Sequence, residues 1–175
     1  KNTVMYQIYP LGYCGAEPNN DGGAVRHRLH TIADRIETLR DLNVNAVLLN
    51  PLLESSAHGY DTIDFFSVDR RLGDEADIRS LIAAMHEAGI RVVFDGVFHH
   101  VGRDFFAFRD VRERLHESAY RDWFIIDFGG NSPYNDGFHY QPWEGHYELV
   151  KLNLDNPAVQ NHLFDAVRKW IDWGI

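Results

Sequence analysis

The order of the apolar segments is the feature that most restricts how this 175-residue chain can fold. Short β-prone runs at 4–8, 45–49 and 90–94 alternate with stretches whose apolar residues recur every three or four positions. The run at 45–49 (Asn-Ala-Val-Leu-Leu) is apolar after its first residue and predicts a strand buried on both faces. Strands that alternate with helices at this spacing predict parallel pairing with right-handed crossovers.

Three helices are predicted from the same periodicity. The first covers 25–42, and the second covers 74–89, with aspartate as a suitable N-cap and glycine just past the end. The third covers 157–174, with Asn156 as N-cap and a proline at the first helical position. Ile175 is then expected to begin a fourth strand.

Residues 101–153 interrupt the alternation, because they hold turn signals, aromatic residues and only one polar helical stretch near 109–120. We predict an inserted subdomain there. Two architectures fit the remainder: a doubly wound sheet, or an α/β fold that is part of a (β/α)8 barrel. The sequence has no Gly-x-Gly-x-x-Gly or P-loop motif, which makes a complete doubly wound domain unattractive. As a partial barrel, the chain divides into a first half (1–100), the insertion (101–153) and the third barrel helix with the start of strand four (154–175).

Composition excludes several partners. The formal net charge of −9 argues against nucleic acid, which requires a basic face. No apolar run is long enough to span a bilayer, and the first three residues show no signal-peptide pattern, so we expect no membrane association and a cytoplasmic location. The single cysteine, Cys14, cannot form an internal disulfide and fits a reducing compartment. The oligomeric state is not indicated.

Ligands bind at the carboxyl ends of the strands in either architecture. The third strand ends in Asp95, followed closely by His99 and His100. Taken alone, this pattern favours a loop-capping aspartate and half-buried histidines. A zinc or iron site is a weaker interpretation, because adjacent histidines on an extended segment are expected to point to opposite faces.

Residues 95–100 (Asp-Gly-Val-Phe-His-His) resemble the first signature motif of the α-amylase family, glycoside hydrolase family 13, which normally reads Asp-x-x-x-Asn-His. Other stretches are similar to that family, and most of all to its neopullulanase, cyclomaltodextrinase and maltogenic amylase branch. In chain order these are 58–60 (His-Gly-Tyr), 64–69 (Asp-Phe-Phe-Ser-Val-Asp), 105–111, 120–124 and 149–153 (Leu-Val-Lys-Leu-Asn).

The resemblance implies the catalytic (β/α)8 TIM barrel of an enzyme that cleaves α-1,4- or α-1,6-glucosidic bonds with retention, acting on maltodextrins, cyclodextrins or starch-like glucans. Retention needs a nucleophilic carboxylate and an acid. By resemblance these groups and a third carboxylate lie beyond Ile175, so no catalytic residue is expected in this chain, and the chain alone is expected to be inactive. The alternative is a non-catalytic sugar-binding or scaffolding member of the fold.

Four residues are assigned to the substrate by resemblance. His100 is expected to hydrogen-bond the sugar at the cleavage site, Tyr60 to stack on it, His58 to flank it and Asp95 to orient neighbouring groups. His99 stands where the family has Asn, which often helps to hold a structural calcium ion. Calcium prefers oxygen ligands, so this replacement argues against such a site, and we expect no metal and no cofactor.

Aromatic side chains are concentrated in the insertion. We expect most to form a small core and one or two to reach the sugar. The residues concerned are Trp123, Tyr134, Phe138, Tyr140, Trp143 and Tyr147.

Overall fold

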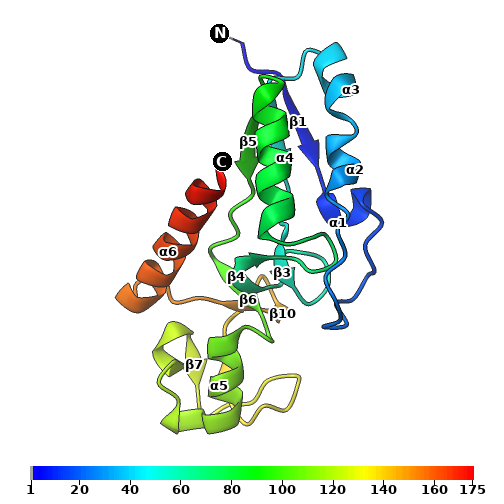
Figure 1. Cartoon of the computed structure of the whole chain (residues 1–175). Coiled ribbons are helices and arrows are strands. Elements are labelled where there is room, and N and C mark those ends of the chain that lie inside the picture. The colour runs from blue at the N-terminus through cyan, green and yellow to red at the C-terminus, as the bar shows by residue number, and fades with distance from the viewer. Residues whose placement is uncertain (1) are drawn as a thin grey trace.

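A computed structural model describes residues 2–175 and has a three-stranded parallel sheet at its centre (Figure 1). The strand order is β1 (Met5–Ile8), β2 (Ala46–Leu49) and β5 (Arg91–Phe94). Both pairings are parallel and in register over four residues of each strand. Val47 and Leu49, which share one face of the central strand, are fully buried, whereas Leu48 on the opposite face is only partly buried, so the predicted burial on both faces is not complete.

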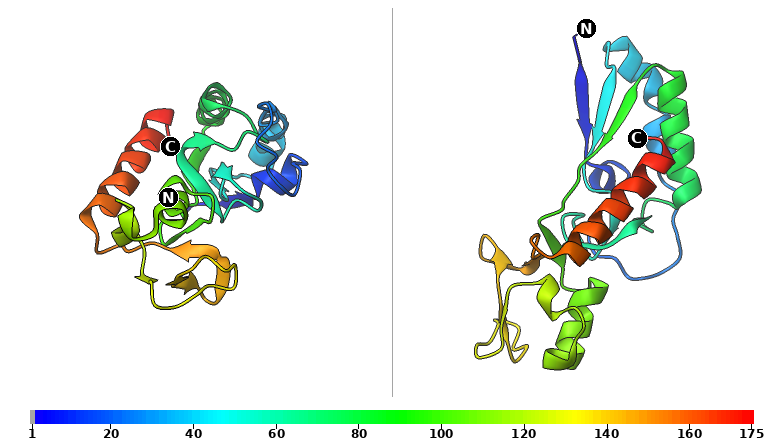
Figure 2. Two further views of the ribbon diagram at one scale, coloured as in Figure 1. Left: turned by 90° about the horizontal axis from the view of Figure 1, so that it is seen from below. Right: turned by 90° about the vertical axis from the view of Figure 1, so that its left-hand side faces the viewer.

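Helices cover one face of this sheet and form an arc around it when it is viewed along the strands (Figure 2). Val47 and Val92 point into the packed face, whereas Met5 and Val93, on the alternate positions, stay 52% and 39% exposed. A doubly wound sheet carries helices on both faces. The one-sided cover therefore favours the barrel. The helices concerned are α2 (His30–Ala33), α3 (Ile36–Asp41), α4 (Glu75–Glu87) and α6 (Pro157–Trp173).

The predicted ends of α4 are confirmed. Asp74 is the N-cap, and its side chain accepts the backbone N–H groups of Ala76 and Asp77. The Asp77 carboxylate accepts the Asp74 N–H at 2.8 Å, which completes a capping box. Gly89 follows the helix with φ +77°, a left-handed conformation that favours glycine.

Both ends of α6 are confirmed as well. The Asn156 side chain accepts the Ala158 N–H at 2.8 Å, and Gly174 ends the helix with φ +115°. Ile171 lies in the helix but is 60% exposed. Ile175, the residue expected to begin a fourth strand, pairs with no strand among residues 2–175, and its N–H lies 3.5 Å from Trp170 O.

The single helix predicted over 25–42 is wrong. The segment before His30 is extended, because the N–H groups of Arg26 and Arg28 bond to the carbonyls of Arg70 and Leu72. The remainder is split into the short helices α2 and α3. Pairing with a segment distant in sequence outweighs the local helical periodicity here.

A β-hairpin that the sequence did not predict follows β2. It consists of β3 (Leu53–Ser55) and β4 (Thr62–Val68), and the loop between them carries the His-Gly-Tyr motif. Phe65 of β4 is fully buried, and its carbonyl accepts the Trp170 indole N–H at 2.8 Å, which ties the hairpin to α6. Before these elements, a one-turn helix α1 (Pro10–Tyr13) follows β1.

The inserted region contains mostly short strands and one helix. Its helix, α5, begins at Phe106, ahead of the predicted 109–120 stretch, because Ala107, Phe108 and Val111 bury one face. The sheet β6-β10-β9 pairs the segment after Asp95 with the end of the insertion. The elements are β6 (His100–Gly102), α5 (Phe106–Arg114), the 3-10 turns η1 (Leu115–Glu117) and η2 (Arg121–Trp123), β7 (Ile126–Asp127), β8 (His139–Tyr140), β9 (Pro142–Trp143) and β10 (His146–Lys151).

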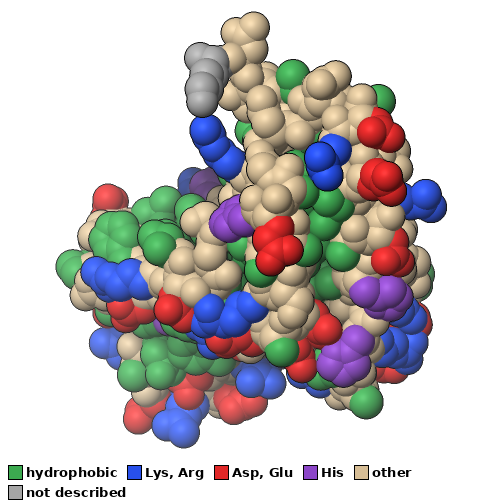
Figure 3. Space-filling model, turned by 45° about the horizontal axis from the view of Figure 1, so that its top comes forward, with side chains coloured by type: hydrophobic (Ala, Val, Ile, Leu, Met, Phe, Trp, Pro, Cys, Tyr) green, Lys and Arg blue, Asp and Glu red, His purple; other side chains and the backbone are tan. Residues whose placement is uncertain are grey.

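Among residues 2–175, no helix has both the length and the apolar character needed to cross a membrane. Apolar side chains nevertheless gather on the side of the molecule where α6 lies (Figure 3). Phe164 and Ile171 of α6 are 56% and 60% exposed.

Candidate active-site cleft

The ends of the three parallel strands are joined by a hydrogen-bond network. Asn50, just after β2, donates from Nδ2 to Asp95 Oδ2 at 3.0 Å and to the Tyr60 hydroxyl at 2.9 Å. Gln7 of β1 donates to Asn50 Oδ1 at 2.8 Å, and the Tyr60 hydroxyl donates to Asp95 Oδ2 at 3.4 Å. Burial and the nearby Asp95 charge raise the pKa of Tyr60, so its hydroxyl keeps its proton. Asp95 therefore contacts the predicted platform residue directly.

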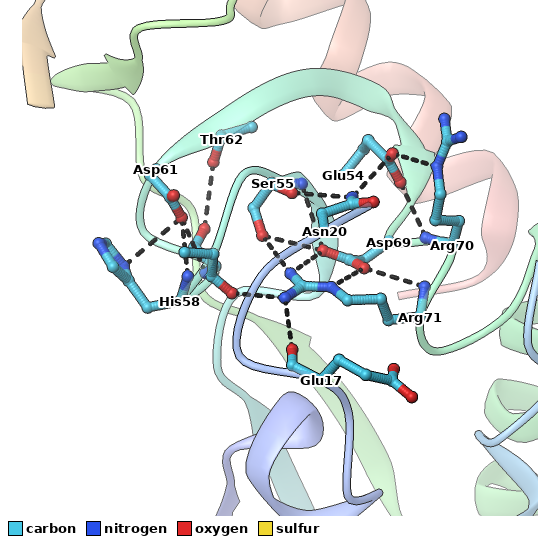
Figure 4. Close-up of polar contacts among 12 residues, drawn as sticks. Glu17, Asn20, Glu54, Ser55, His58, Asp61, Thr62, Asp69, Arg70 and Arg71 are labelled. Atoms are coloured by element: carbon cyan, nitrogen blue, oxygen red, sulfur yellow. Dashed lines mark hydrogen bonds and ion pairs between the residues drawn. The ribbon is translucent and has the colours of Figure 1, made fainter. Parts of the chain in front are cut away.

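The loop that carries His58 and Tyr60 is held by hydrogen bonds from its backbone N–H groups to its own side chains (Figure 4). Asp61 is buried, and its Oδ1 accepts the N–H groups of His58 and Gly59 at 3.0 and 3.1 Å. His58 Nδ1 in turn accepts the Tyr60 N–H at 3.2 Å. Gly59 has φ +91°, and a Cβ there would lie 2.9 Å from Pro51 O, so only glycine fits this turn.

His100 and His99 lie behind this loop. His100 is 5% exposed, and its Nε2 lies 3.0 Å from the Tyr60 carbonyl oxygen. The two histidine side chains were expected to point to opposite faces, which is wrong: their Nδ1 atoms are 3.2 Å apart. The chain leaves β5 before this point and turns into β6, so the alternation of an extended strand does not apply. Burial and the adjacent His99 lower the pKa of His100, which keeps its ring neutral.

Trp143 of β9 forms the wall opposite the loop. Its ring lies against His100, with centroids 5.2 Å apart, and stacks on His146 at 5.8 Å. The other aromatic residues of the insertion pack mainly on one another: Tyr140 and Phe138 are fully buried. Between the two walls is an open hollow of about 500 Å³. Its lining residues are His58, Tyr60, Val97, His100, Trp143, His146, Glu148 and Leu149.

A buried arginine supports the loop from beneath (Figure 4). Arg71 is 2% exposed and pairs with the fully buried Asp69, with Nη2 2.6 Å from Oδ2 and Nε 2.8 Å from Oδ1. Its Nη1 donates to Ala57 O at 2.7 Å, directly before His58, and to Glu17 O at 2.9 Å. One guanidinium thus links the hairpin, the motif loop and the segment after α1.

Sequence reasoning assigned His58, Tyr60, Asp95 and His100 to one site, and the structure brings all four together. It missed Asn50, Asp61 and Arg71, which hold them in place. For Arg71 a signal was available: charged residues at 69–71 follow directly after β4 and lie between the apolar residues Val68 and Leu72.

A group of potential metal ligands lies elsewhere. Within residues 2–175, ligand atoms of His27, Asp74 and Asp77 fall within 4.8 Å of one another at the start of α4. Their contacts are explained without an ion, because both aspartates cap the helix and His27 Nδ1 lies 2.6 Å from Asp77 Oδ2. This group takes no part in the cleft.

Comparison with known proteins decides the family. A family model described as the catalytic domain of alpha amylase matches residues 7–175. The chain belongs to the α-amylase catalytic-domain family. It is 35% identical to neopullulanase 2 of Thermoactinomyces vulgaris, over 100% of this chain and 33% of that protein. It is also 35% identical to a cyclomaltodextrinase of Thermoanaerobacter pseudethanolicus, over 97% of this chain and 32% of the other.

A solved structure supports the same placement. The cyclic α-maltosyl-(1→6)-maltose hydrolase of Arthrobacter globiformis, in complex with maltose, has a TM-score of 0.86 and 34% identity, covering 99% of this chain and 43% of that one. Structural neighbours of this kind are TIM-barrel enzymes of the α-amylase family. The chain spans about a third of the length of the curated relatives and corresponds to an amino-terminal part of the family's catalytic region.

Proposed function

We propose that this chain supplies the substrate-positioning part of an α-glucan-acting glycoside hydrolase, which cleaves α-1,4- or α-1,6-glucosidic bonds with retention. In this proposal, the three parallel strands are the first three strands of a (β/α)8 barrel, and residues 101–153 form a subdomain inserted after the third. The catalytic carboxylates lie beyond Ile175. Maltodextrins, cyclodextrins and starch-like glucans are the proposed substrate class.

The observation that carries the proposal is the way Tyr60 is held beside the hollow. Its hydroxyl is bonded to Asn50 and Asp95, and its carbonyl lies within hydrogen-bond distance of His100. The side chain is 38% exposed despite these contacts, so a face of the ring remains accessible. An aromatic ring fixed at the carboxyl ends of barrel strands offers a sugar a flat apolar surface at small entropic cost.

The chemistry assigned to these residues is orientation. A retaining hydrolase needs two carboxyl groups about 5–5.5 Å apart, and the bond to be cleaved must be held between them. Tyr60 would set the plane of the sugar ring, and His58 would flank it. The Nε2 of His100 lies against the Tyr60 carbonyl, which accepts its hydrogen. A sugar hydroxyl can therefore bond to this N–H only as a second acceptor beside the carbonyl.

We also propose that His99 holds no structural calcium. Its Nδ1 is engaged with His100, and an imidazole nitrogen is a poor ligand for a cation that prefers oxygen. No step of the proposed reaction passes through a metal.

The test uses the full-length protein that contains this chain, assayed beside the 175-residue piece for reducing-end release from maltoheptaose and cyclodextrins. We expect activity in the full-length protein and none in the piece. Tyr60→Ala should lower kcat/KM about tenfold or more, because aromatic stacking contributes about 0.5–1.5 kcal/mol beyond the buried area. Tyr13→Ala is the matched control, since Tyr13 is 45% exposed on α1 and is not among the lining residues of the hollow.

An inactive but folded full-length protein that still binds maltodextrin would refute hydrolysis and leave a non-catalytic sugar-binding member of the family. Equal effects of Tyr60→Ala and Tyr13→Ala would refute the role assigned to Tyr60.

A further inference from the structure

His99 is the position at which the chain departs from the Asp-x-x-x-Asn-His pattern, and its contacts suggest a use for the replacement. Its Nδ1 lies 3.2 Å from Nδ1 of His100, and the two rings meet edge to face with centroids 5.4 Å apart. Its own carbonyl accepts the Leu152 N–H at 2.9 Å, next to β10. The His99 backbone is therefore fixed. Nδ1 of its ring lies against His100 Nδ1, and the ring also meets Trp143 edge to face with centroids 6.3 Å apart.

The proton positions on His100 follow from its partners. Its Nε2 lies 3.0 Å from the carbonyl oxygen of Tyr60, and a carbonyl can only accept, so Nε2 carries the hydrogen. Burial lowers the pKa of His100, and the charge of a protonated His99 would lower it further. A neutral ring with its hydrogen on Nε2 has a lone pair on Nδ1.

The contact between the two rings then has one consistent assignment. Because His100 Nδ1 accepts, the hydrogen must come from His99 Nδ1. We propose that His99 is a positioning residue: its Nδ1–H bonds to His100 Nδ1, fixes the His100 tautomer, and thereby holds the His100 Nε2–H on the Tyr60 carbonyl. The inference rests on the proposed function, in which Tyr60 receives the sugar.

The consequence for Tyr60 is restraint at two separated points. Asn50 and Asp95 hold the hydroxyl at the tip of the side chain, and His100 holds the backbone carbonyl. With the opposite tautomer, His100 would present a bare Nε2 lone pair to that carbonyl oxygen, and the two would repel. A misplaced ring weakens sugar binding without altering any group that reacts, so the expected defect lies in KM rather than in kcat.

The test compares His99→Leu, which has no donor, with His99→Asn, whose amide N–H can donate to the same nitrogen and matches the family pattern. Full-length protein labelled with 15N-histidine is examined by NMR, because protonated and bare ring nitrogens resonate in separate regions. His100→Gln identifies the His100 signals. In the wild type we expect a protonated His99 Nδ1, a protonated His100 Nε2, a bare His100 Nδ1 and a nitrogen–nitrogen coupling across the hydrogen bond.

In His99→Leu we expect the His100 ring to lose its single tautomer, so that its Nδ1 signal shifts towards the protonated region and its Nε2 signal towards the bare region. We expect kcat/KM to fall about 3- to 10-fold through KM, the range of one hydrogen bond. His99→Asn should restore both. A bare His99 Nδ1 in the wild type would overturn the inference, as would equal losses in both variants at unchanged thermal midpoints. If the full-length protein cleaves no glucan, the proposed function fails, but the nitrogen spectra still decide the tautomer.

Discussion

The buried pair Arg71–Asp69 gives the sharpest stability prediction. Arg71 is 2% exposed and Asp69 is 0% exposed, so neither charge is solvated by water. Arg71→Met keeps most of the side-chain volume but leaves the Asp69 carboxylate buried without its partner. Removing one member of a buried ion pair costs about 3–5 kcal/mol. The carbonyls of Ala57 and Glu17 also lose their donor, with Nη1 distances of 2.7 and 2.9 Å in the native pair.

The assay is urea unfolding of the full-length protein, followed by the fluorescence of its tryptophans. With a denaturant slope of about 2–3 kcal/mol/M, a loss of about 3–5 kcal/mol lowers the midpoint by about 1–2.5 M. The control is Arg168→Met, because Arg168 pairs with Asp165 while its side chain is 71% exposed, and such pairs contribute less than about 1 kcal/mol.

A second variant separates charge from shape. Asp69→Leu combined with Arg71→Met removes both charges, and apolar replacement of a whole buried pair is often neutral. The double variant should therefore be more stable than Arg71→Met alone. An Arg71→Met midpoint within about 0.3 M of the Arg168→Met midpoint would refute the reasoning, because the pair would then contribute no more than a surface pair.

Two further predictions concern the cleft loop and the aromatic cluster. Both Gly59 and Gly89 have a positive φ, but only a Cβ at Gly59 would meet a backbone oxygen, that of Pro51 at 2.9 Å. In thermal unfolding, Gly59→Ala should therefore lose more stability than Gly89→Ala, for which about 1–2 kcal/mol is expected. Equal losses in the two variants would contradict this. His162 has a buried Nε2 with no hydrogen-bond partner among residues 2–175, and burial lowers its pKa from 6.5. The free energy of unfolding therefore falls as pH drops below 6.5, where the unfolded chain binds a proton that the folded chain does not. Urea titrations should show that the His162→Leu variant loses less stability than the wild type between about pH 7 and about pH 5. An equal loss in both proteins would exclude His162 as the source of this pH dependence.

Local signals predicted the elements that depend on local chemistry. The capping box of Asp74, the N-cap of Asn156 and the glycines that end both long helices were readable because each involves residues within a few positions of one another. The central strand was readable from its unbroken apolar run, although helices cover only one face of the sheet and Leu48 on the other face is only partly buried.

The elements that were missed depend on partners distant in sequence. The segment before His30 looks helical by periodicity, yet Arg26 and Arg28 bond across more than forty positions to the carbonyls of Arg70 and Leu72. The hairpin β3–β4 is likewise tied to segments distant in sequence, by Arg71 to the Glu17 carbonyl and by the Phe65 carbonyl to α6. No periodicity encodes such contacts, so propensity alone gave the wrong result.

The candidate site was predictable as a set of residue types but not as a geometry. The family motif selected His58, Tyr60, Asp95 and His100, and they do come together. The relation of His99 to His100 was predicted wrongly, because an extended backbone was assumed where the chain turns from β5 into β6. Here the motif identified which residues come together more reliably than the contacts that position them.

The supports of the cleft loop act on different atoms, and this bears on how the site tolerates change. Arg71 holds the carbonyl of Ala57, His100 holds the carbonyl of Tyr60, and Asn50 holds the Tyr60 hydroxyl. Each comes from a different part of the fold, so loss of one leaves the loop attached but shifts the ring. Because a misplacement of about 1 Å can cost about a hundredfold in rate, these distant supports would, under the proposed function, matter to substrate binding as much as the residues proposed to contact the sugar.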